Sequence, residues 1–230
     1  MSRHLNNLLL ARLDEATMSA LTPHLAVTHL EQGRVLSETH STIDKVYFPH
    51  SGIISCVVEL VGGGAIETGM IGRDGQFGAG PAMDHKVSLN HVVVQVAGDV
   101  SVIEGPRFRL IAEEHPSLQV TTLAYEQFMT AQIQQTAACN AVHKVPERIC
   151  KWLLRMHRLT GDELPLTQEF LAQMMGVRRT SVTQVAVDLQ QAGMITYHRG
   201  RIKILDIRMI ERTACECDAA VNAHFARVFD

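Results

Sequence analysis

The chain has 230 residues, of which 46% are hydrophobic and 20% are charged, and its formal net charge is −3. This hydrophobic content supports a packed globular core in one large domain or two small ones. The longest apolar runs are far shorter than the roughly 20 residues that cross a bilayer, and the N-terminus lacks a signal-peptide pattern. The five cysteines are scattered and odd in number, which favours free thiols over disulfides. We therefore expect a cytoplasmic protein with no membrane partner.

The charge is distributed unevenly along the chain. Residues 1–143 contain 8 Lys and Arg against 14 Asp and Glu, whereas residues 144–212 contain 12 against 7. A basic segment behind an acidic one indicates that only the later segment faces a polyanion.

The first half of the chain has the pattern of short helices followed by many strands. Residues 8–25, "LLLARLDEATMSALTPHL", predict one or two short helices. From about residue 25 to residue 108, short apolar stretches such as "KVYFP", "GIISCVVELV", "AIETGMI", "HVVVQVA" and "DVSVI" are separated by Gly, Asp, Pro and Ser clusters. Helical periodicity is absent there. This spacing predicts an antiparallel β-barrel or sandwich.

A long helix is expected next, because residues 117–145 contain neither Gly nor Pro and follow Pro116, which suits a first helical position. One heptad line consists of Leu118, Thr121, Tyr125, Phe128, Gln132, Gln135, Cys139 and Val142, and a second apolar line of Leu123, Met129 and Ile133. Two lines indicate two partners, so the helix covers its own chain and pairs with the same helix of a second copy. The alternative is a helix buried within one chain.

Another helix is expected from Pro146 to Leu159, after a hinge at residues 143–146, and the segment "TGDELP" ends it. Its apolar positions have helical spacing. We interpret them as core residues: Ile149, Trp152, Leu153 and Met156.

Two short helices joined by a tight turn follow. Thr167 is expected to cap the first helix, residues 168–175, whose inward face consists of Leu171, Met174 and Met175. Gly176 permits the left-handed backbone that ends a helix abruptly, and Val177 fills the corner. The second helix begins near Arg179 and ends at Gly193, with an inward face of Val182, Val185, Leu189 and Ala192. This pattern predicts a helix-turn-helix.

The outward face of the second helix carries side chains that can read DNA bases. In the major groove, Arg pairs with guanine, Gln pairs with adenine and a Thr methyl contacts thymine, and each good pair discriminates by about 1–3 kcal/mol. A face that serves only solubility usually mixes Glu and Lys, whereas this one has no acid before Asp188. The residues are Arg178, Arg179, Thr180, Ser181, Thr183, Gln184 and Val187.

The segment "MITYHRGRIKILD", residues 194–206, alternates apolar and polar residues around a Gly and predicts a β-hairpin with Gly200 in its turn. Next to a helix-turn-helix, such a hairpin is a wing. Its cations are expected to lie near DNA phosphates and to supply affinity without sequence information: Arg199, Arg201 and Lys203.

The segment "LTQEFLAQMMGVRRTSVTQVAVDLQQAGMI" is similar to the DNA-reading segment of the Crp/Fnr family of bacterial transcription regulators, and Gly33, "VYFPHSG" and "GQFG" resemble the family's β-domain. The resemblance covers nearly the whole chain. It implies an α+β fold: an N-terminal antiparallel β-barrel of the cyclic-nucleotide-binding-like jelly-roll type in residues 1–115, a dimerisation helix and hinge in residues 116–145, and a C-terminal winged helix-turn-helix in residues 146–230.

The resemblance also assigns roles within the DNA-binding domain. It implies base contacts by Arg179, Thr180 and Gln184 and a phosphate contact by Ser181, and we expect Thr167 and Gln168 to lie at the same interface. Arg178 departs from the family, which often has Ser or Asp as the helix cap there. The implied partners are double-stranded DNA, a second copy of the chain in a homodimer, and RNA polymerase.

The β-domain departs from family members that bind cyclic AMP. Their "FGE" supplies a Glu for the ribose and a later Arg for the phosphate, whereas this chain reads "FGAGPAMDHKVSLNHVVV" and has no Arg between Gly78 and Pro106. The nearby Lys86 lacks the bidentate fork that a phosphate favours. We therefore expect no usual response to cyclic AMP. The candidate effector-binding residues are Gly78, Ala79, Lys86, Ser88 and Leu89.

Neither a metal cofactor nor an enzyme is expected from the sequence, and the effector stays unassigned. An iron-sulfur cluster of the family type needs several N-terminal cysteines, and none precedes Cys56; the twelve histidines show no distinctive haem spacing. The "CECD" segment with His224 is a weak metal motif, and a C-terminal helix packed on the winged domain is favoured. The Gly-rich "GMIGRDG" lacks the βαβ unit of a dinucleotide site.

These observations favour a homodimeric, sequence-specific transcription regulator that binds a near-palindromic operator. Two alternatives stay open. One is a regulator gated by a cyclic nucleotide or another small ligand. The other is a ligand-binding β-domain that acts through protein partners, against which the basic C-terminal segment argues.

Overall fold

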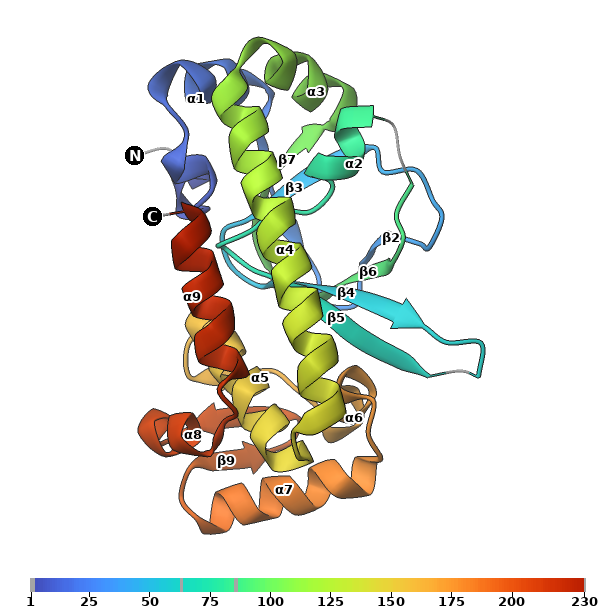
Figure 1. Cartoon of the computed structure of the whole chain (residues 1–230), viewed down its shortest axis with the longest axis vertical. Coiled ribbons are helices and arrows are strands. Elements are labelled where there is room, and N and C mark those ends of the chain that lie inside the picture. The colour runs from blue at the N-terminus through green and yellow to red at the C-terminus, as the bar shows by residue number, and fades with distance from the viewer. Residues whose placement is uncertain (1–2, 63, 85–86, 230) are drawn as a thin grey trace. The chain divides into compact units, whose positions relative to one another are not determined.

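The computed structural model describes residues 3–62, 64–84 and 87–229 (Figure 1). Its contacts divide the chain into two compact units, one that combines Met1–Cys56 with Gly69–Thr130 and one that combines Val57–Thr68 with Ala131–Val228. None of the helices formed by the described residues is both long and apolar enough to cross a membrane.

The N-terminal segment folds into short helices, but into more of them than the one or two predicted for residues 8–25. They are η1 (Arg3–Asn6), which lies before that range, η2 (Leu10–Arg12), α1 (Glu15–Leu21) and η3 (Thr22–His24). Asn7 attaches this segment to the strands. Its buried amide nitrogen donates to the carbonyl oxygens of Pro49 and Gly75, at 2.9 and 2.8 Å, and its amide oxygen accepts from the backbone N–H groups of Leu9 and Leu10. All four hydrogen bonds of the amide are therefore made within the protein.

The described residues then form seven strands in the region where the sequence predicted strands. Their bounds are β1 (Ala26–Leu30), β2 (Val35–Ser37), β3 (Lys45–Pro49), β4 (Ile53–Glu59), β5 (Ala65–Ile71), β6 (His91–Val96) and β7 (Gly98–Glu104). The expectation that this region lacks helix was wrong at α2 (Ala79–Asp84). A helix of six residues is too short for its periodicity to stand out in the sequence.

Within residues 26–104, the described strands form two separate sheets, with the orders β1-β7-β3 and β2-β6-β4-β5. The α+β class with an antiparallel jelly-roll-like domain is confirmed, but a closed barrel is not formed. Strand β7 pairs antiparallel with both β1 and β3, and its partners include Val102 with Ala26 and Val102 with Tyr47. Apolar residues from strands and flanking helices fill the core: Leu10, Leu21, Leu25, Val46, Phe48, Ala79, Ala82, Ile103, Phe108, Ile111, Ala112 and Leu118.

The long helix is present as α4 (Pro116–Val142), after α3 (Gly105–Glu114). It begins at Pro116 as predicted but ends at Val142, three residues before the expected end at Val145. Val145 is instead the first residue of α5 (Val145–Thr160). The amide of Lys144 donates to the side chain of Glu147, at 3.1 Å, and so caps the new helix. Residues 143 and 144 thus separate two helices at the predicted hinge.

The two predicted lines of α4 differ in burial. The first line is mostly buried, at Leu118, Tyr125, Phe128, Gln132 and Cys139, although its last member, Val142, is exposed. In the second line, Leu123 and Ile133 are exposed, together with Val120, whereas Met129 is buried. The prediction that Met129 belongs to the second line was therefore wrong. Met129 follows Phe128 directly and lies on the same wide, buried face of α4.

The remaining elements belong to the second unit, except that Phe229 at the end of α9 is grouped with the first. They are β8 (Glu163–Leu164), α6 (Gln168–Met175), α7 (Arg179–Gln191), β9 (Ile195–His198), β10 (Arg201–Ile204), α8 (Ile207–Thr213) and α9 (Cys217–Phe229). The predicted core residues of α5 are buried, including the single Trp152. A C-terminal helix is also present, as predicted, and Asp218 in its first turn forms an ion pair with Arg158 of α5.

Candidate nucleic-acid interface

The first helix of the predicted pair, α6, forms for the reasons that its sequence suggested. The hydroxyl of Thr167 accepts a hydrogen bond from the backbone N–H of Phe170, at 3.1 Å, which satisfies one of the unpaired donors at the helix start. The inward residues Leu171, Met174 and Met175 are all buried. Both the cap and the apolar face are therefore confirmed.

The turn after α6 is a Schellman motif. Gly176 adopts the left-handed conformation, with φ of 63°. Its N–H bonds to the carbonyl oxygen of Gln173, at 3.1 Å, and the N–H of Val177 bonds to that of Ala172, at 3.0 Å. Val177 is half-buried at the corner. The predicted role of Gly176 is confirmed.

A buried cation that the sequence analysis did not identify holds the end of α6. The guanidinium of Arg148, on α5, donates to the backbone carbonyl of Met175 at 2.7 Å. Arg148 is only 8% exposed. A cation near the negative end of a helix dipole is favourable, and this one also satisfies an unpaired carbonyl. The available signal was the position of Arg148 one turn before Trp152, within the apolar stripe of α5.

The second helix, α7, begins at Arg179 as predicted and ends with another Schellman motif. The N–H of Gly193 bonds to the carbonyl oxygen of Gln190, and the N–H of Met194 bonds to that of Leu189, each at 2.9 Å. Arg178 occupies the N-cap position without a side-chain hydrogen bond to the helix start. Arg178 thus lacks the side-chain cap that Ser or Asp supplies in related proteins.

The buried face of α7 consists of Val182, Val185, Ala186 and Leu189. Three of these residues were predicted, but the fourth predicted residue, Ala192, is exposed. The helix ends at Gln191, so the helical period no longer applies at Ala192.

The residues predicted to read DNA lie on the outer face of α7. Ser181 is half-buried, and the others are exposed: Arg178, Arg179, Thr180, Thr183, Gln184 and Val187. Three of them also contact neighbouring side chains. Arg179 lies 3.6 Å from the carboxylate of Glu169, Thr183 donates to the side-chain oxygen of Gln168 at 2.7 Å, and the amide of Gln184 donates to Asp188 at 2.9 Å. The start of α6 and the outer face of α7 thus form one continuous surface.

The predicted wing is a three-stranded sheet with the order β8-β10-β9, in which β8 was not foreseen. Arg199 and Gly200 both have positive φ, 46° and 77°, which is the signature of a type I′ hairpin turn. Arg199, Arg201 and Lys203 are exposed.

The wing contacts both helices of the pair. The hydroxyl of Tyr197, on β9, accepts a hydrogen bond from the backbone N–H of Gln168, at 3.2 Å. The backbone N–H of Tyr197 donates to the side chain of Gln190 on α7, at 2.9 Å. Residues from α6, α7 and the wing are therefore held together as one polar and basic surface, defined here as the reading surface. It consists of Thr167, Gln168, Arg178, Arg179, Thr180, Ser181, Thr183, Gln184, Arg199 and Arg201.

The candidate effector residues that the structure describes differ in burial. Ala79 is fully buried in the core that includes Phe48 and Phe108, so its side chain faces the core. Gly78 is buried with φ of 92°, and Leu89 is 77% exposed. Lys86 lies outside the described residues.

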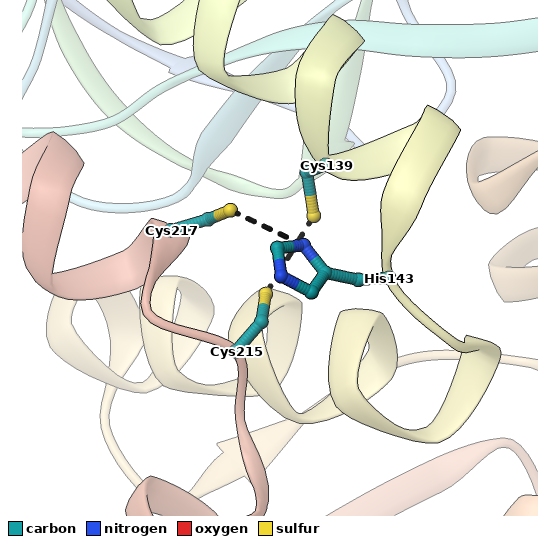
Figure 2. A group of neighbouring side chains, drawn as sticks. All are labelled: Cys139, His143, Cys215 and Cys217. Carbon is teal, nitrogen blue, oxygen red and sulfur yellow. Dashed lines mark hydrogen bonds between the residues drawn. The ribbon is translucent and has the colours of Figure 1, made fainter.

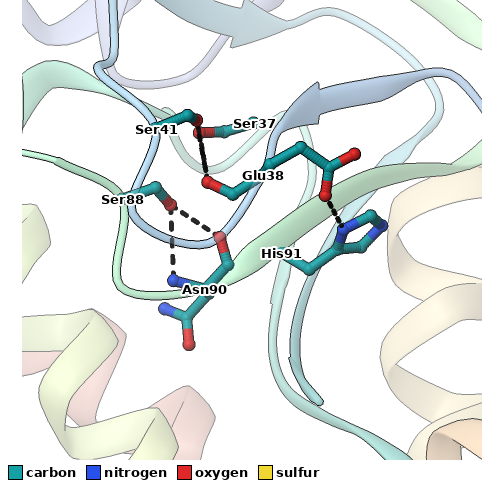
Figure 3. Close-up of polar contacts among 6 residues, drawn as sticks. All are labelled: Ser37, Glu38, Ser41, Ser88, Asn90 and His91. Atoms are coloured by element: carbon teal, nitrogen blue, oxygen red, sulfur yellow. Dashed lines mark hydrogen bonds and ion pairs between the residues drawn. The ribbon is translucent and has the colours of Figure 1, made fainter.

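Hydrogen bonds within and between loops engage the polar groups near Ser88 (Figure 3). The hydroxyl of Ser88 donates a hydrogen bond to the backbone carbonyl oxygen of Asn90, at 2.7 Å. The hydroxyl of Ser41 donates to the backbone carbonyl oxygen of Glu38, at 2.8 Å. The imidazole of His91 lies 2.8 Å from the Glu38 carboxylate. Ser88 thus contributes to the local fold of its loop.

The cysteines of the "CECD" segment do not pair with His224. Cys215 and Cys217 instead lie beside Cys139 and His143. Burial raises the pKa of Cys139, and it raises the pKa of Cys215 to about 12, so both are neutral thiols at pH 7 when no metal is bound. The "CECD" segment signalled only half of this group in the sequence, because Cys139 and Cys215 are 76 residues apart.

Comparisons with known proteins agree with this architecture. Residues 147–213 match the family model of the Crp-like helix-turn-helix domain. No curated protein matches the chain. Among solved structures, FixK2 from Bradyrhizobium japonicum is similar with a TM-score of 0.71 at 11% sequence identity, over 83% of this chain and 98% of that chain.

Two further solved structures have comparable similarity. The c-di-GMP responsive global regulator CLP of Xanthomonas campestris has a TM-score of 0.68 at 14% identity, over 84% of this chain and 100% of that chain. A transcriptional regulator of the CRP family from Thermus thermophilus has a TM-score of 0.67 at 19% identity, over 81% of this chain and 96% of that chain. The chain shares one fold with these regulators.

The two Schellman turns generate a prediction about stability. Replacing Gly176 or Gly193 with Ala places a Cβ atom on a left-handed residue, so each change is expected to lower the free energy of unfolding by about 1–2 kcal/mol. Urea unfolding of the full chain measures this. The matched control is Gly62→Ala, because no neighbouring atom lies near a Cβ there and the backbone is not left-handed. Equal midpoints for all three variants would contradict the role of the turns.

Proposed function

We propose that this protein is a DNA-binding transcription regulator of the Crp/Fnr type that binds a near-palindromic operator as a homodimer. The proposal is supported by the match of residues 147–213 to the Crp-like helix-turn-helix domain and by the fold that the chain shares with a CRP-family regulator. The observation that carries the proposal is the reading surface. Arg, Thr and Gln side chains are exposed along one face of a helix whose opposite face is buried.

Base recognition is assigned to the first turns of α7. Arg179, Thr180 and Gln184 present a guanidinium, a hydroxyl with a methyl group, and an amide, which are the groups that distinguish base edges in the major groove. The side chains that Arg179 and Gln184 contact in the free protein are exposed, so DNA can replace those contacts at little energetic cost. Ser181, Thr183, Thr167 and Gln168 are assigned to the same interface.

The wing is assigned a different task. Arg199 and Arg201 lie on either side of the hairpin turn apex, at Gly200, and are exposed. Cations at such a position attract any phosphate backbone, and their contribution decreases as salt rises because bound counterions are released. The wing therefore strengthens binding without selecting a sequence.

These two assignments predict different defects. Arg179→Ala is expected to reduce discrimination at one base position by about 1–3 kcal/mol, whereas Arg201→Ala is expected to weaken binding to all sequences similarly and to reduce the salt slope by about 1. Selection of bound DNA from a random pool identifies the operator, and titrations at several salt concentrations measure both effects. Arg107→Ala, an exposed change in the other unit, is the control. An unchanged base preference in Arg179→Ala would contradict its assigned role.

Homodimerisation is assigned to α4. Val120, Leu123 and Ile133 are exposed on this helix, while Leu118, Tyr125 and Phe128 are buried within the chain. An apolar line that the chain itself does not cover suits pairing with a second copy. Paired helices would hold two copies of α7 about one DNA turn, or ~34 Å, apart.

Leu123→Glu is expected to weaken the dimer about 10- to 100-fold, because one buried Leu contributes about 1.5–3 kcal/mol. Sedimentation over a range of concentrations measures the dissociation constant. The control is Leu110→Glu, which introduces the same charge at another exposed leucine, on α3. A wild-type chain that is monomeric at tens of micromolar would exclude this mode of pairing.

We further propose that the regulator does not respond to cyclic AMP. Ala79 stands at the position of the family's ribose-binding Glu and is buried in the core, and no Arg follows before Pro106. Residues 1–115 then serve as a sensor or structural domain, residues 116–145 as dimerisation helix and hinge, and residues 146–230 as the DNA-binding domain. RNA polymerase is the proposed partner in transcription.

Calorimetric titration of the protein with cyclic AMP tests whether the nucleotide binds. We expect no heat of binding at micromolar nucleotide and no change in operator affinity when cyclic AMP is added. Micromolar binding that depends on residues 78–89 would refute the proposal and would favour a regulator gated by a cyclic nucleotide.

A further inference from the structure

Three cysteines and one histidine converge between the end of α4 and the segment that joins α8 to α9 (Figure 2). Cys139 lies on the last turns of α4, His143 follows the helix, and Cys215 and Cys217 lie just before α9 and at its start. One ligand atom from each of the four residues lies within 4.8 Å of the other three. The three cysteines are buried, and all four residues belong to the same compact unit.

The distances within this group match the edges of a small coordination tetrahedron. The sulfur atoms of Cys139 and Cys215 are 3.6 Å apart, and the sulfur of Cys217 is 3.5 Å from Nδ1 of His143. Around Zn²⁺, bond lengths of about 2.3 Å to sulfur and 2.0 Å to nitrogen give edges of about 3.8 Å between two sulfurs and about 3.5 Å between sulfur and nitrogen. The separation of the two sulfurs is much larger than a disulfide bond of about 2.05 Å.

The surrounding groups are also those that a metal site requires. Nδ1 of His143 faces Cys217, and the opposite nitrogen, Nε2, lies 3.2 Å from the carboxylate of Glu216. A carboxylate on the far nitrogen of an imidazole fixes its orientation and makes it a stronger ligand. The amide of Gln135 donates to the sulfur of Cys217 at 3.1 Å, which would stabilise a thiolate there.

We propose that Cys139, His143, Cys215 and Cys217 bind one Zn²⁺ ion. Three thiolates and one imidazole are a preferred donor set for this ion. Because the protein supplies all four ligands, no position is left for a substrate or water, so the role of the ion is structural. This proposal replaces the expectation from the sequence that the protein has no metal site.

The site joins the two ends of the DNA-binding domain. Residues 147–213, the Crp-like helix-turn-helix domain, lie between the first pair of ligands and the second pair. An ion held by both pairs closes a chain segment of 76 residues between Cys139 and Cys215. Closing a long segment restricts the unfolded chain, so metal binding is expected to stabilise the domain that carries α7.

The first test is the metal content of the full-length protein, purified under reducing conditions without chelators. We expect one zinc per chain by elemental mass spectrometry. Cys139→Ser and Cys215→Ser are expected to lose the metal. Cys150→Ser is the matched control, since Cys150 is also a buried free cysteine of this unit but lies outside the cluster.

A second test does not depend on variants that lose a buried ligand. When the chelated and reduced protein is titrated with Co²⁺, we expect thiolate charge-transfer bands and the intense visible bands of a tetrahedral ion. Glu216→Gln keeps all four ligands and changes a side chain that is 77% exposed, so the variant should fold. It is expected to bind Zn²⁺ about 10- to 100-fold more weakly in competition with a chelator.

Three results would overturn the proposal. One is a folded, reduced wild-type protein that shows no thiolate bands with Co²⁺ and contains no stoichiometric metal. Another is a Co²⁺ spectrum of Cys139→Ser identical to that of the wild type. The third is a disulfide between Cys139 and Cys215 in the freshly purified metal-free protein. None of these results bears on DNA binding itself, so the proposed function is tested separately.

Discussion

The direction of α7 depends on the short turn that precedes it. Only three residues, 176–178, connect α6 to α7, so the left-handed conformation of Gly176 largely determines where α7 points. Arg148 holds the end of α6 by its bond to the carbonyl of Met175, which places the beginning of the turn relative to α5. The exposure of Arg179 and Gln184 follows from this geometry, because the opposite face of α7 is buried.

Features that follow from local rules could be predicted from the sequence. Thr167 as a cap, Gly176 and Gly193 as helix ends, and Gly200 in a hairpin turn each depend on a few neighbouring residues. The inward residues of α6 and most of those of α7 follow from helical periodicity. These rules were sufficient to place the side chains of the reading surface on α6, α7 and the wing.

Features that depend on distant parts of the chain could not be predicted. The division of the seven strands into two sheets depends on which strands pair, and β1 pairs with β7 across about 70 residues. The bond from Arg148 to Met175 and the meeting of Cys139 with Cys215 likewise depend on tertiary packing. Sequence proximity favoured His224 as the partner of the C-terminal cysteines, whereas folding brings His143 to them.

The backbone of Arg199 has a conformation that long side chains rarely adopt. Its φ of 46° is a conformation that Asn or Gly adopts more readily, and a long side chain there is disfavoured by about 1 kcal/mol. A hairpin optimised for folding alone would have Asn-Gly at this turn. The chain instead retains a slightly destabilised turn that carries an exposed and positively charged side chain.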